Sequence, residues 1–190
     1  MTKDLSRRRT TSMTGLPDQL PVDFRAFHQL HRPAYVHRAA SLLNNHSDAE
    51  EAVDTAFEQL ARDWDKVLAM ENPAAYAWTV MKNRAIDLAR ARGRRPYLLQ
   101  SAAFETLALR TAVDPIGQLE ESMSLCQAVR DLPERQQDVI ILWYFHGYTS
   151  AQIATHLGIT AAGVRSTARS ARRALHEALV CKGSADDLAH

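Results

Sequence analysis

The chain has 190 residues, which suffices for one domain of ordinary size or for two small ones. Its hydrophobic content of 46% and charged content of 24% exclude an intrinsically disordered chain, and good helix formers such as Ala, Leu, Arg and Glu dominate. Two distant cysteines, Cys126 and Cys181, exclude a disulfide framework and a cysteine metal site, and we expect no cofactor. The sequence has neither a run of about eighteen apolar residues nor the apolar core of a signal peptide. We therefore expect an all-α protein of the reducing cytoplasm, without a membrane span.

The net charge of +1 conceals two basic segments. Residues 82–95 contain six Lys or Arg and one Asp, and residues 163–173 contain four Arg and no acid. Residues 96–123, between them, contain one Arg and four acids. Two basic segments on either side of an acidic connector predict two separate contacts with a polyanion. The alternative is that each basic segment is merely a solvated helix face.

The N-terminal part of the chain predicts a tail followed by helices. Residues 1–21 form a basic tail that we expect to be disordered. In the helix after it, Pro33 either breaks or kinks the helix or starts a second one. The next helix, DAEEAVDTAFEQLARDW, is expected to be capped by Ser47 and Asp48 and to carry Trp64 in its apolar stripe.

A further helix is predicted to begin at Asn72 and Pro73, because proline suits the first helical position, and to end at Gly93. Together these helices predict one domain over residues 22–95. Residues 96–122 lose the helical periodicity, and we interpret them as a flexible acidic linker.

A second domain is predicted over residues 123–180, with a frayed tail at 181–190. Its first helix, ERQQDVIILWYFHG, has an apolar run too dense for an exposed surface and is expected to form the packing floor of the domain. In TSAQIATHLGIT, Thr149 and Thr160 suit two helix caps, and Gly158 suits the turn between two helices. This segment predicts a helix-turn-helix unit.

The final helix of this unit separates into an apolar face and a basic face. Apolar residues recur at spacings of three and four, at Val164, Ala168, Ala171, Leu175 and Ala178. A recognition helix in the major groove of DNA needs this combination, because one face holds the domain and the other meets phosphates and bases. We expect Arg165 and Ser166 to approach bases. The candidate DNA contacts are Thr160, Arg165, Ser166, Arg169, Arg172 and Arg173. The alternative is an exposed basic helix.

The helix DAEEAVDTAFEQLARDW has an acidic face opposite its apolar stripe. Its members are Asp48, Glu51, Asp54 and Glu58. This face is either solvated or a surface for a basic protein partner.

The helix after Asn72 carries a polar row opposite Trp78 and Met81, which are expected to point inward. The row consists of Thr79, Asn83, Asp87 and Arg90. Such groups can read base edges, and the trailing Arg92, Arg94 and Arg95 can hold phosphates. Since phosphate would repel Asp87, we expect that residue to have a base amino group or a neighbouring Arg as its partner. We interpret Tyr76, like Trp78, as a core residue.

These motifs are, in chain order, DAEEAVDTAF, NPAAYAWTVMKNRAIDLARARGRRP and LPERQQDVIILWYFHGYTSAQIATHLGITAAGVRSTARSARRAL. Their order resembles that of a bacterial RNA polymerase sigma factor. The resemblance is to the extracytoplasmic-function subgroup (group 4), which keeps two domains called region 2 and region 4. It covers roughly residues 22–180.

The resemblance implies roles for the candidate residues. The acidic face matches the surface that docks on the β′ clamp of core RNA polymerase, and the β flap and promoter DNA are further implied partners. The loop Lys66 to Asn72 matches the place where a flipped promoter base is captured, and the final helix matches the reader of the minus-thirty-five element. The linker matches the segment in the RNA path, and an anti-sigma protein is a partner common in the subgroup. The segment that matches the minus-ten reader supplies Asn83, Arg84, Asp87 and Arg90, to which we add Thr79, Arg94 and Arg95.

These observations predict a promoter-specificity subunit that is not an enzyme and that binds promoter DNA poorly without core polymerase. The alternative is a polymerase-independent activator or repressor with a LuxR-like helix-turn-helix, which would bind a palindrome as a dimer.

Overall fold

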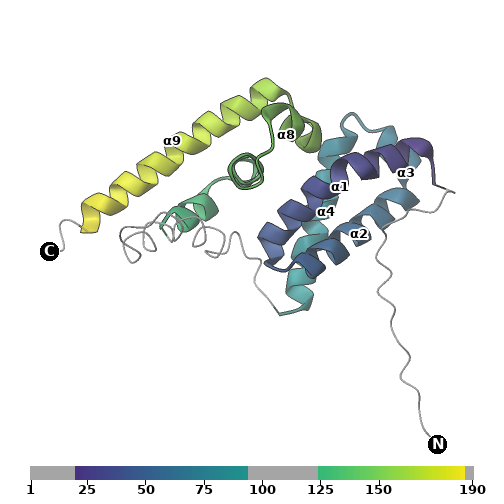
Figure 1. Cartoon of the computed structure of the whole chain (residues 1–190), viewed down its shortest axis with the longest axis horizontal. Helices are drawn as coiled ribbons and strands as arrows, with labels where there is room; N and C mark the ends of the chain where they lie inside the picture. Colours follow the sequence, from purple (N-terminus) through teal and green to yellow (C-terminus); the bar gives the residue numbers. More distant parts are fainter. Residues whose placement is uncertain (1–19, 94–123, 187–190) are drawn as a thin grey trace, which may run out of the picture.

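The computed structural model describes residues 20–93 and 124–186, with side chains as far as residue 180. Every regular element within these two ranges is a helix, which agrees with the all-α prediction. Helices α1, α2 and α4 pack into a bundle, and α8 lies at its side, while α9 extends away from the bundle (Figure 1).

Helix α1 runs without interruption from Val22 to Leu43 and contains Pro33. The prediction of a break or of a second helix at this proline was therefore wrong. Pro33 and Gln29, whose carbonyl would accept the N–H that proline lacks, are both exposed. Water can hydrogen bond to the carbonyl of Gln29, and the helix tolerates the missing bond there.

Helix α2 spans His46–Arg62, and a short helix α3 spans Trp64–Leu68. The cap of α2 is Asn45, whose side chain accepts a hydrogen bond from the backbone N–H of Asp48, so the predicted cap at Ser47 and Asp48 was wrong. The predicted single helix through Trp64 is also wrong, because α2 ends before that residue. Trp64 is nevertheless buried, against Phe24 of α1.

Helix α4 spans Pro73–Ala91. As predicted, it is capped by the side chain of Asn72 and has a proline at its start. Gly93 follows its end with a φ of +64°, a backbone conformation that suits glycine. The large side chains that fill the core between α1, α2 and α4 include Tyr35, Phe57, Trp78 and Met81.

The C-terminal part comprises helical residues 124–131, α7 (Glu134–Ile140), the π-helix η1 (Ile141–Phe145), α8 (Ser150–Leu157) and α9 (Ala161–Asp186). The sequence predicts one regular helix up to Gly147, whereas the chain changes to π-helical geometry at Ile141. Helix α9 continues past residue 180, where the sequence predicts a frayed tail to begin.

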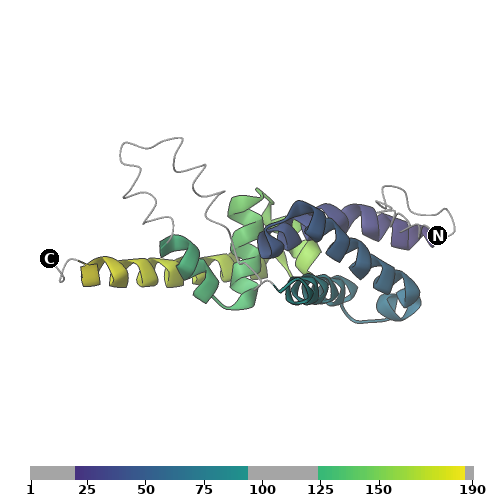
Figure 2. The ribbon, with the colours of Figure 1, turned by 90° about the horizontal axis from the view of Figure 1, so that it is seen from below.

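The hydrophobic core of the N-terminal bundle extends into the C-terminal half, which also has a second, smaller cluster around Val129, Ile141 and Ala171. Val139, Leu142, Ile153, Leu157 and Val164 belong to the same buried cluster as the core residues of α1, α2 and α4. A view at right angles to the first shows the same arrangement, with α9 reaching away from a single packed body (Figure 2). The sequence predicts two domains joined by a flexible linker, and in this structure they are packed together. Residues 96–122, the predicted linker, lie outside the described ranges.

Candidate functional site

The helix-turn-helix unit has the caps that the sequence predicts. The side chain of Thr149 accepts from the backbone of Gln152, and the Gln152 side chain accepts in return, which makes a capping box at the start of α8. Gly158 ends α8 with a φ of +63°. The Thr160 hydroxyl accepts the N–H of Gly163 and caps α9.

Helix α9 has the two faces that the sequence predicts. Val164, Ala168 and Ala171 are buried against the rest of the molecule. The candidate DNA contacts of this helix are all exposed, namely Thr160, Arg165, Ser166, Arg169, Arg172 and Arg173. Their charged groups are therefore accessible to phosphates and base edges.

The polar row on α4 is also accessible. Its exposed members are Thr79, Asn83, Asp87 and Arg90. The Asp87 carboxylate lies 3.7 Å from Arg84 and 3.9 Å from Arg90. Of the two kinds of partner that the sequence predicts for Asp87, a base amino group or a neighbouring Arg, this structure shows the neighbouring Arg. Arg84 is half-buried and also donates to the side chain of Gln59 on α2. Arg94 and Arg95 lie outside the described residues.

Arg92 does not match its prediction as a phosphate contact. Its guanidinium donates to the carboxylates of Asp48 and Glu51 on α2, so two anions already occupy it. This contact ties the end of α4 to the start of α2.

The acidic face of α2 is only partly exposed. Asp48, which we expected on that face, is 4% exposed because Arg92 and the bundle cover it. Asp54 is half-buried and accepts two hydrogen bonds from Arg32 of α1. Glu51 and Glu58 are exposed. Glu51, however, accepts from Arg92, so Glu58 is the most available of the four predicted carboxylates.

The two aromatic residues at the start of α4 differ. Trp78 is buried, as predicted, whereas Tyr76 is 37% exposed, so its interpretation as a core residue was wrong. Leu68 and Met70, in and after α3, are exposed as well. The segment before α4 thus presents apolar surface, and the first turns of α4 present the Tyr76 ring.

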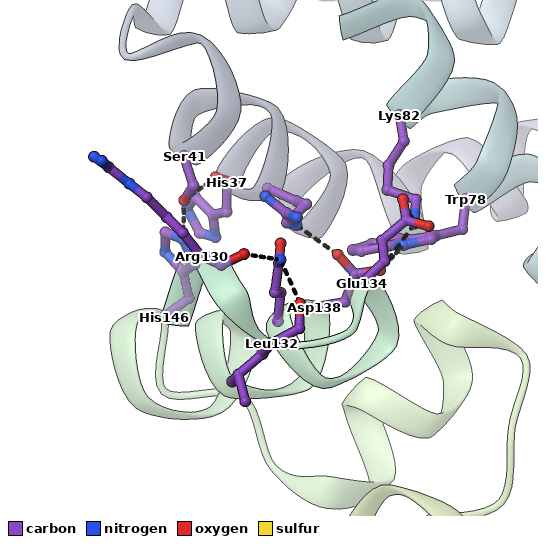
Figure 3. Close-up of polar contacts among 11 residues, drawn as sticks. His37, Ser41, Trp78, Lys82, Arg130, Leu132, Glu134, Asp138 and His146 are labelled. Atoms are coloured by element: carbon purple, nitrogen blue, oxygen red, sulfur yellow. Dashed lines mark hydrogen bonds and ion pairs between the residues drawn. The ribbon is translucent and has the colours of Figure 1, made fainter. Parts of the chain in front are cut away.

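A buried ion cluster, which the sequence analysis missed, joins the two halves of the chain (Figure 3). Its centre is Asp138 on α7, which is 3% exposed. One carboxylate oxygen accepts from Arg38 Nε of α1 at 2.7 Å, and the other accepts from Trp78 Nε1 at 2.9 Å and Lys82 Nζ at 3.0 Å, both of α4. Lys82 also contacts the Glu134 carboxylate at 2.7 Å. In the sequence, the signal was a charged residue directly before the apolar run of the packing helix.

The cluster keeps Asp138 ionised despite its burial. Burial alone raises the pKa of this carboxyl, but the attraction of Arg38 and Lys82 and the hydrogen bonds from Arg38 and Trp78 outweigh it, so the pKa lies below its ordinary value. Arg38 itself is 1% exposed. A buried pair of this kind costs desolvation, which good geometry and additional hydrogen bonds must offset.

The turn of the helix-turn-helix unit rests on the start of α4. The side-chain amide of Asn72 donates to the carbonyl of Gly158. A Cβ at position 158 would lie 2.1 Å from Asn72 Oδ1 and 2.8 Å from the backbone nitrogen of Ala75. Glycine is therefore required at 158 both for its positive φ and for this close approach.

Comparisons with known proteins match both halves of the chain. Residues 27–95 match the family model described as Sigma-70 region 2, and residues 122–175 match Sigma-70, region 4. The ECF RNA polymerase sigma factor SigL of Mycobacterium tuberculosis is 31% identical over 132 residues, which cover 67% of this chain and 74% of SigL. The RNA polymerase sigma-E factor of Streptomyces coelicolor is 24% identical over 161 residues, which cover 85% of this chain and 88% of that protein.

A further relative is longer than this chain. The probable RNA polymerase sigma factor RfaY of Xanthomonas campestris is 28% identical over 143 residues. The match covers 70% of this chain and 35% of RfaY, so the chain spans about a third of the length of this relative.

Proposed function

Because this chain belongs to the sigma-70 family of RNA polymerase sigma factors, in the extracytoplasmic-function subgroup, we propose that it binds core RNA polymerase and directs it to promoters. In this proposal the chain supplies binding energy and sequence selection and catalyses no reaction itself. It acts in the cytoplasm, on the nucleoid, wherever the polymerase that carries it engages DNA.

Two surfaces support contacts with promoter DNA. The exposed basic face of α9 reads the minus-thirty-five element, with Arg165 and Ser166 near bases and the later arginines on phosphates. The exposed row on α4 reads the minus-ten element through Asn83, Asp87 and Arg90. The observation that carries the assignment is that both rows are exposed on helices whose opposite faces are buried.

The exposed carboxylates of α2 support a contact with the β′ clamp of the polymerase. Glu51 and Glu58 face solvent, and Asp54 lies between them on the same helix face. Asp48 is buried and has an indirect role: its carboxylate binds the Arg92 guanidinium, which also donates to Glu51. The region 4 half contacts the β flap, and an anti-sigma protein is a further partner, which would cover these same faces.

The test is run-off transcription from promoters selected with the reconstituted holoenzyme. Core polymerase alone is expected to give no promoter-specific transcript, and core with this chain is expected to give one. If the chain neither binds core nor confers promoter-specific transcription, the proposal is wrong. A footprint on a palindrome by a dimer of the chain alone would instead indicate an activator or repressor.

A further inference from the structure

The packed arrangement of the two halves is incompatible with the simultaneous reading of two promoter elements. The turn before α9 contacts the start of α4, and α4 has 19 residues, or about 28 Å at 1.5 Å per residue. Elements at minus ten and minus thirty-five are about 25 base pairs apart, or about 85 Å at 3.4 Å per base pair. If the proposed function holds, the region 4 half must leave the bundle before both faces can meet DNA.

Histidines form two of the contacts that hold the region 4 half in place. The Nδ1 atoms of His31 on α1 and His156 on α8 lie 3.2 Å apart, and both side chains are buried. The rings of His37 on α1 and His146, which follows η1, stack at 4.6 Å with an interplanar angle of 3°.

Polar neighbours complete the second histidine pair. His37 Nδ1 lies 3.1 Å from the Tyr148 hydroxyl. His146 Nε2 lies 3.2 Å from the Ser41 hydroxyl (Figure 3). All these contacts cross from one half of the chain to the other.

Neither pair accommodates two protonated imidazoles. Two facing ring nitrogens make a hydrogen bond when one carries a proton and the other accepts it, whereas two doubly protonated rings present a donor to a donor. Two parallel imidazolium rings at 4.6 Å repel each other.

The other charged groups at this interface do not relieve that repulsion. Arg38 on α1 and Lys82 on α4 add positive charge, and His46 on α2 is a further titratable group near His37. The two carboxylates from α7, Asp138 and Glu134, are bonded to Arg38 and Lys82. The sequence of α8 contributes His156 as its one titratable residue, and η1 contributes Tyr144.

We propose that these two histidine pairs form a proton-sensitive latch, which holds the two halves together while the imidazoles are neutral and releases the region 4 half when they are protonated. The biological role of the latch rests on the proposed function, because release is what frees both DNA faces. The pH-dependent opening itself does not, since it follows from the contacts between the two halves of the chain.

The direction of the pH dependence follows from the environment of the rings. Burial lowers the pKa of His31 to about 4, with the charge of His156 adding to the effect, and burial also lowers the pKa of His146 to about 4, with His37 and Arg38 adding. Partial desolvation lowers the pKa of His37, which stays exposed in the closed chain, and burial lowers the pKa of His156. In the open state the rings are hydrated, with a pKa near the ordinary value of 6.5. The open state therefore binds more protons below pH 6.5, and the closed state loses stability as the pH falls from there toward 4.

The expected change in the ratio of open to closed chain follows from these pKa values. Between pH 7.5 and pH 5.5, one histidine whose pKa falls from 6.5 to about 4 on closure raises the ratio of open to closed chain about tenfold. His31 and His146 together give about a hundredfold, provided that they titrate independently.

The experiment measures energy transfer between two dyes in the full chain without polymerase. Dyes are attached to cysteines at the exposed positions Thr55 on α2 and Ser170 on α9, with Cys126→Ala and Cys181→Ala to remove the native thiols. Energy transfer is expected to fall on acidification from pH 7.5 to pH 5.5. With His31→Gln, His37→Gln, His146→Gln and His156→Gln together, it is expected to stay constant, because the amide of glutamine donates and accepts but does not titrate.

Controls separate the latch from general effects of acid. His176→Gln, at an exposed position on α9, is expected to keep the full pH response. Should the fourfold variant fail to fold by circular dichroism, the two pairs are replaced separately, and each double variant is expected to lose part of the response. An unchanged energy transfer in the parent chain, or an undiminished response in the histidine variants, would overturn the latch. Neither result depends on polymerase, so failure of the latch and failure of the proposed function remain distinguishable.

Discussion

The side chain of Asn72 both caps α4 and donates a hydrogen bond to the carbonyl of Gly158, the glycine of the helix-turn-helix turn. Asn72 is the last residue of the loop that the family resemblance assigns to a flipped promoter base, and Gly158 directly precedes the reader of the upstream element. The two candidate DNA surfaces therefore lie next to residues that contact each other. Their proposed targets are about 85 Å apart on DNA, at 3.4 Å per base pair. This contact defines the closed state and gives the first prediction.

Replacing Gly158 with Ala is expected to destabilise the chain by about 2 kcal/mol or more, because the left-handed conformation costs about 1–2 kcal/mol and the added Cβ clashes with Asn72. Urea denaturation checks this. Gly147→Ala is the matched control, since φ there is +69° but nothing lies within 4 Å of an added Cβ, and only the conformational cost of about 1–2 kcal/mol is expected. Equal losses in the two variants would contradict the close approach at 158.

The buried ion cluster gives a second prediction. Asp138→Asn is expected to cost about 3–5 kcal/mol of unfolding free energy, because it leaves Arg38 and Lys82 buried without a counter-charge. Glu134→Gln removes an exposed carboxylate from the same lysine and is expected to cost less than about 1 kcal/mol. Both are measured by urea denaturation at neutral pH.

The pH dependence of the cluster has a definite sign. The pKa of Asp138 is lowered in the folded chain, so its stabilising effect is complete above the unfolded pKa and is lost as the pH falls through the lower folded pKa. Asp138 therefore does not titrate between pH 7.5 and pH 5.5. The fall in energy transfer over this range, which reports opening of the chain, is expected to persist in Asp138→Asn. A fall that vanished in this variant would assign the response to the carboxylate rather than to the histidines.

The two kinds of arginine on α9 are expected to respond differently. Arg165→Ala should weaken holoenzyme binding to the selected promoter by about 1–3 kcal/mol and relax the preference at one base position. Arg172→Ala should weaken binding evenly across sequences and lower the slope of log affinity against log salt by about 1. Both residues are exposed, so neither substitution should change the unfolding free energy. The measurement is promoter binding over a salt series, with the exposed Arg135→Ala on α7 as the control.

The acidic face of α2 is tested by charge reversal. Glu58→Lys is expected to weaken binding to core polymerase at least about tenfold, or about 1.4 kcal/mol, with folding unchanged because the side chain is exposed. Affinity for labelled core, without DNA, is the measurement. Glu177→Lys makes the same charge change at an exposed position on α9 and should leave core affinity unaltered. If both variants bind core like the parent chain, the docking assignment is wrong.

Local features of the fold were predictable from the sequence because short-range chemistry determines them. Asn72, Thr149 and Thr160 cap the helices for which they were predicted, and Gly158 turns between α8 and α9. Where several local solutions compete, prediction failed. Asn45 caps α2 in place of Ser47, and α1 accommodates Pro33, where the residue whose carbonyl loses its partner, Gln29, is exposed.

The candidate site was predictable where a residue's role depends on one helix face. The basic face of α9 and the row on α4 follow from spacing alone, and both are exposed. Asp48 and Arg92 have the same kind of pattern, yet each is occupied by the other. Whether a charged side chain is available depends on what another helix brings to it, which periodicity does not reveal.

By itself the sequence determined the helices, their caps, the two candidate DNA-reading faces and, through the order of the motifs, the family. Only the tertiary structure decided that Asp138 would be buried between Arg38 and Lys82, that the histidines would meet in pairs, and that Gly158 would rest on Asn72. The physical reason is range. Helix periodicity and capping depend on residues within a few positions of one another, whereas these contacts join residues as far apart as 125 positions, and their energies depend on burial that only the packed chain creates.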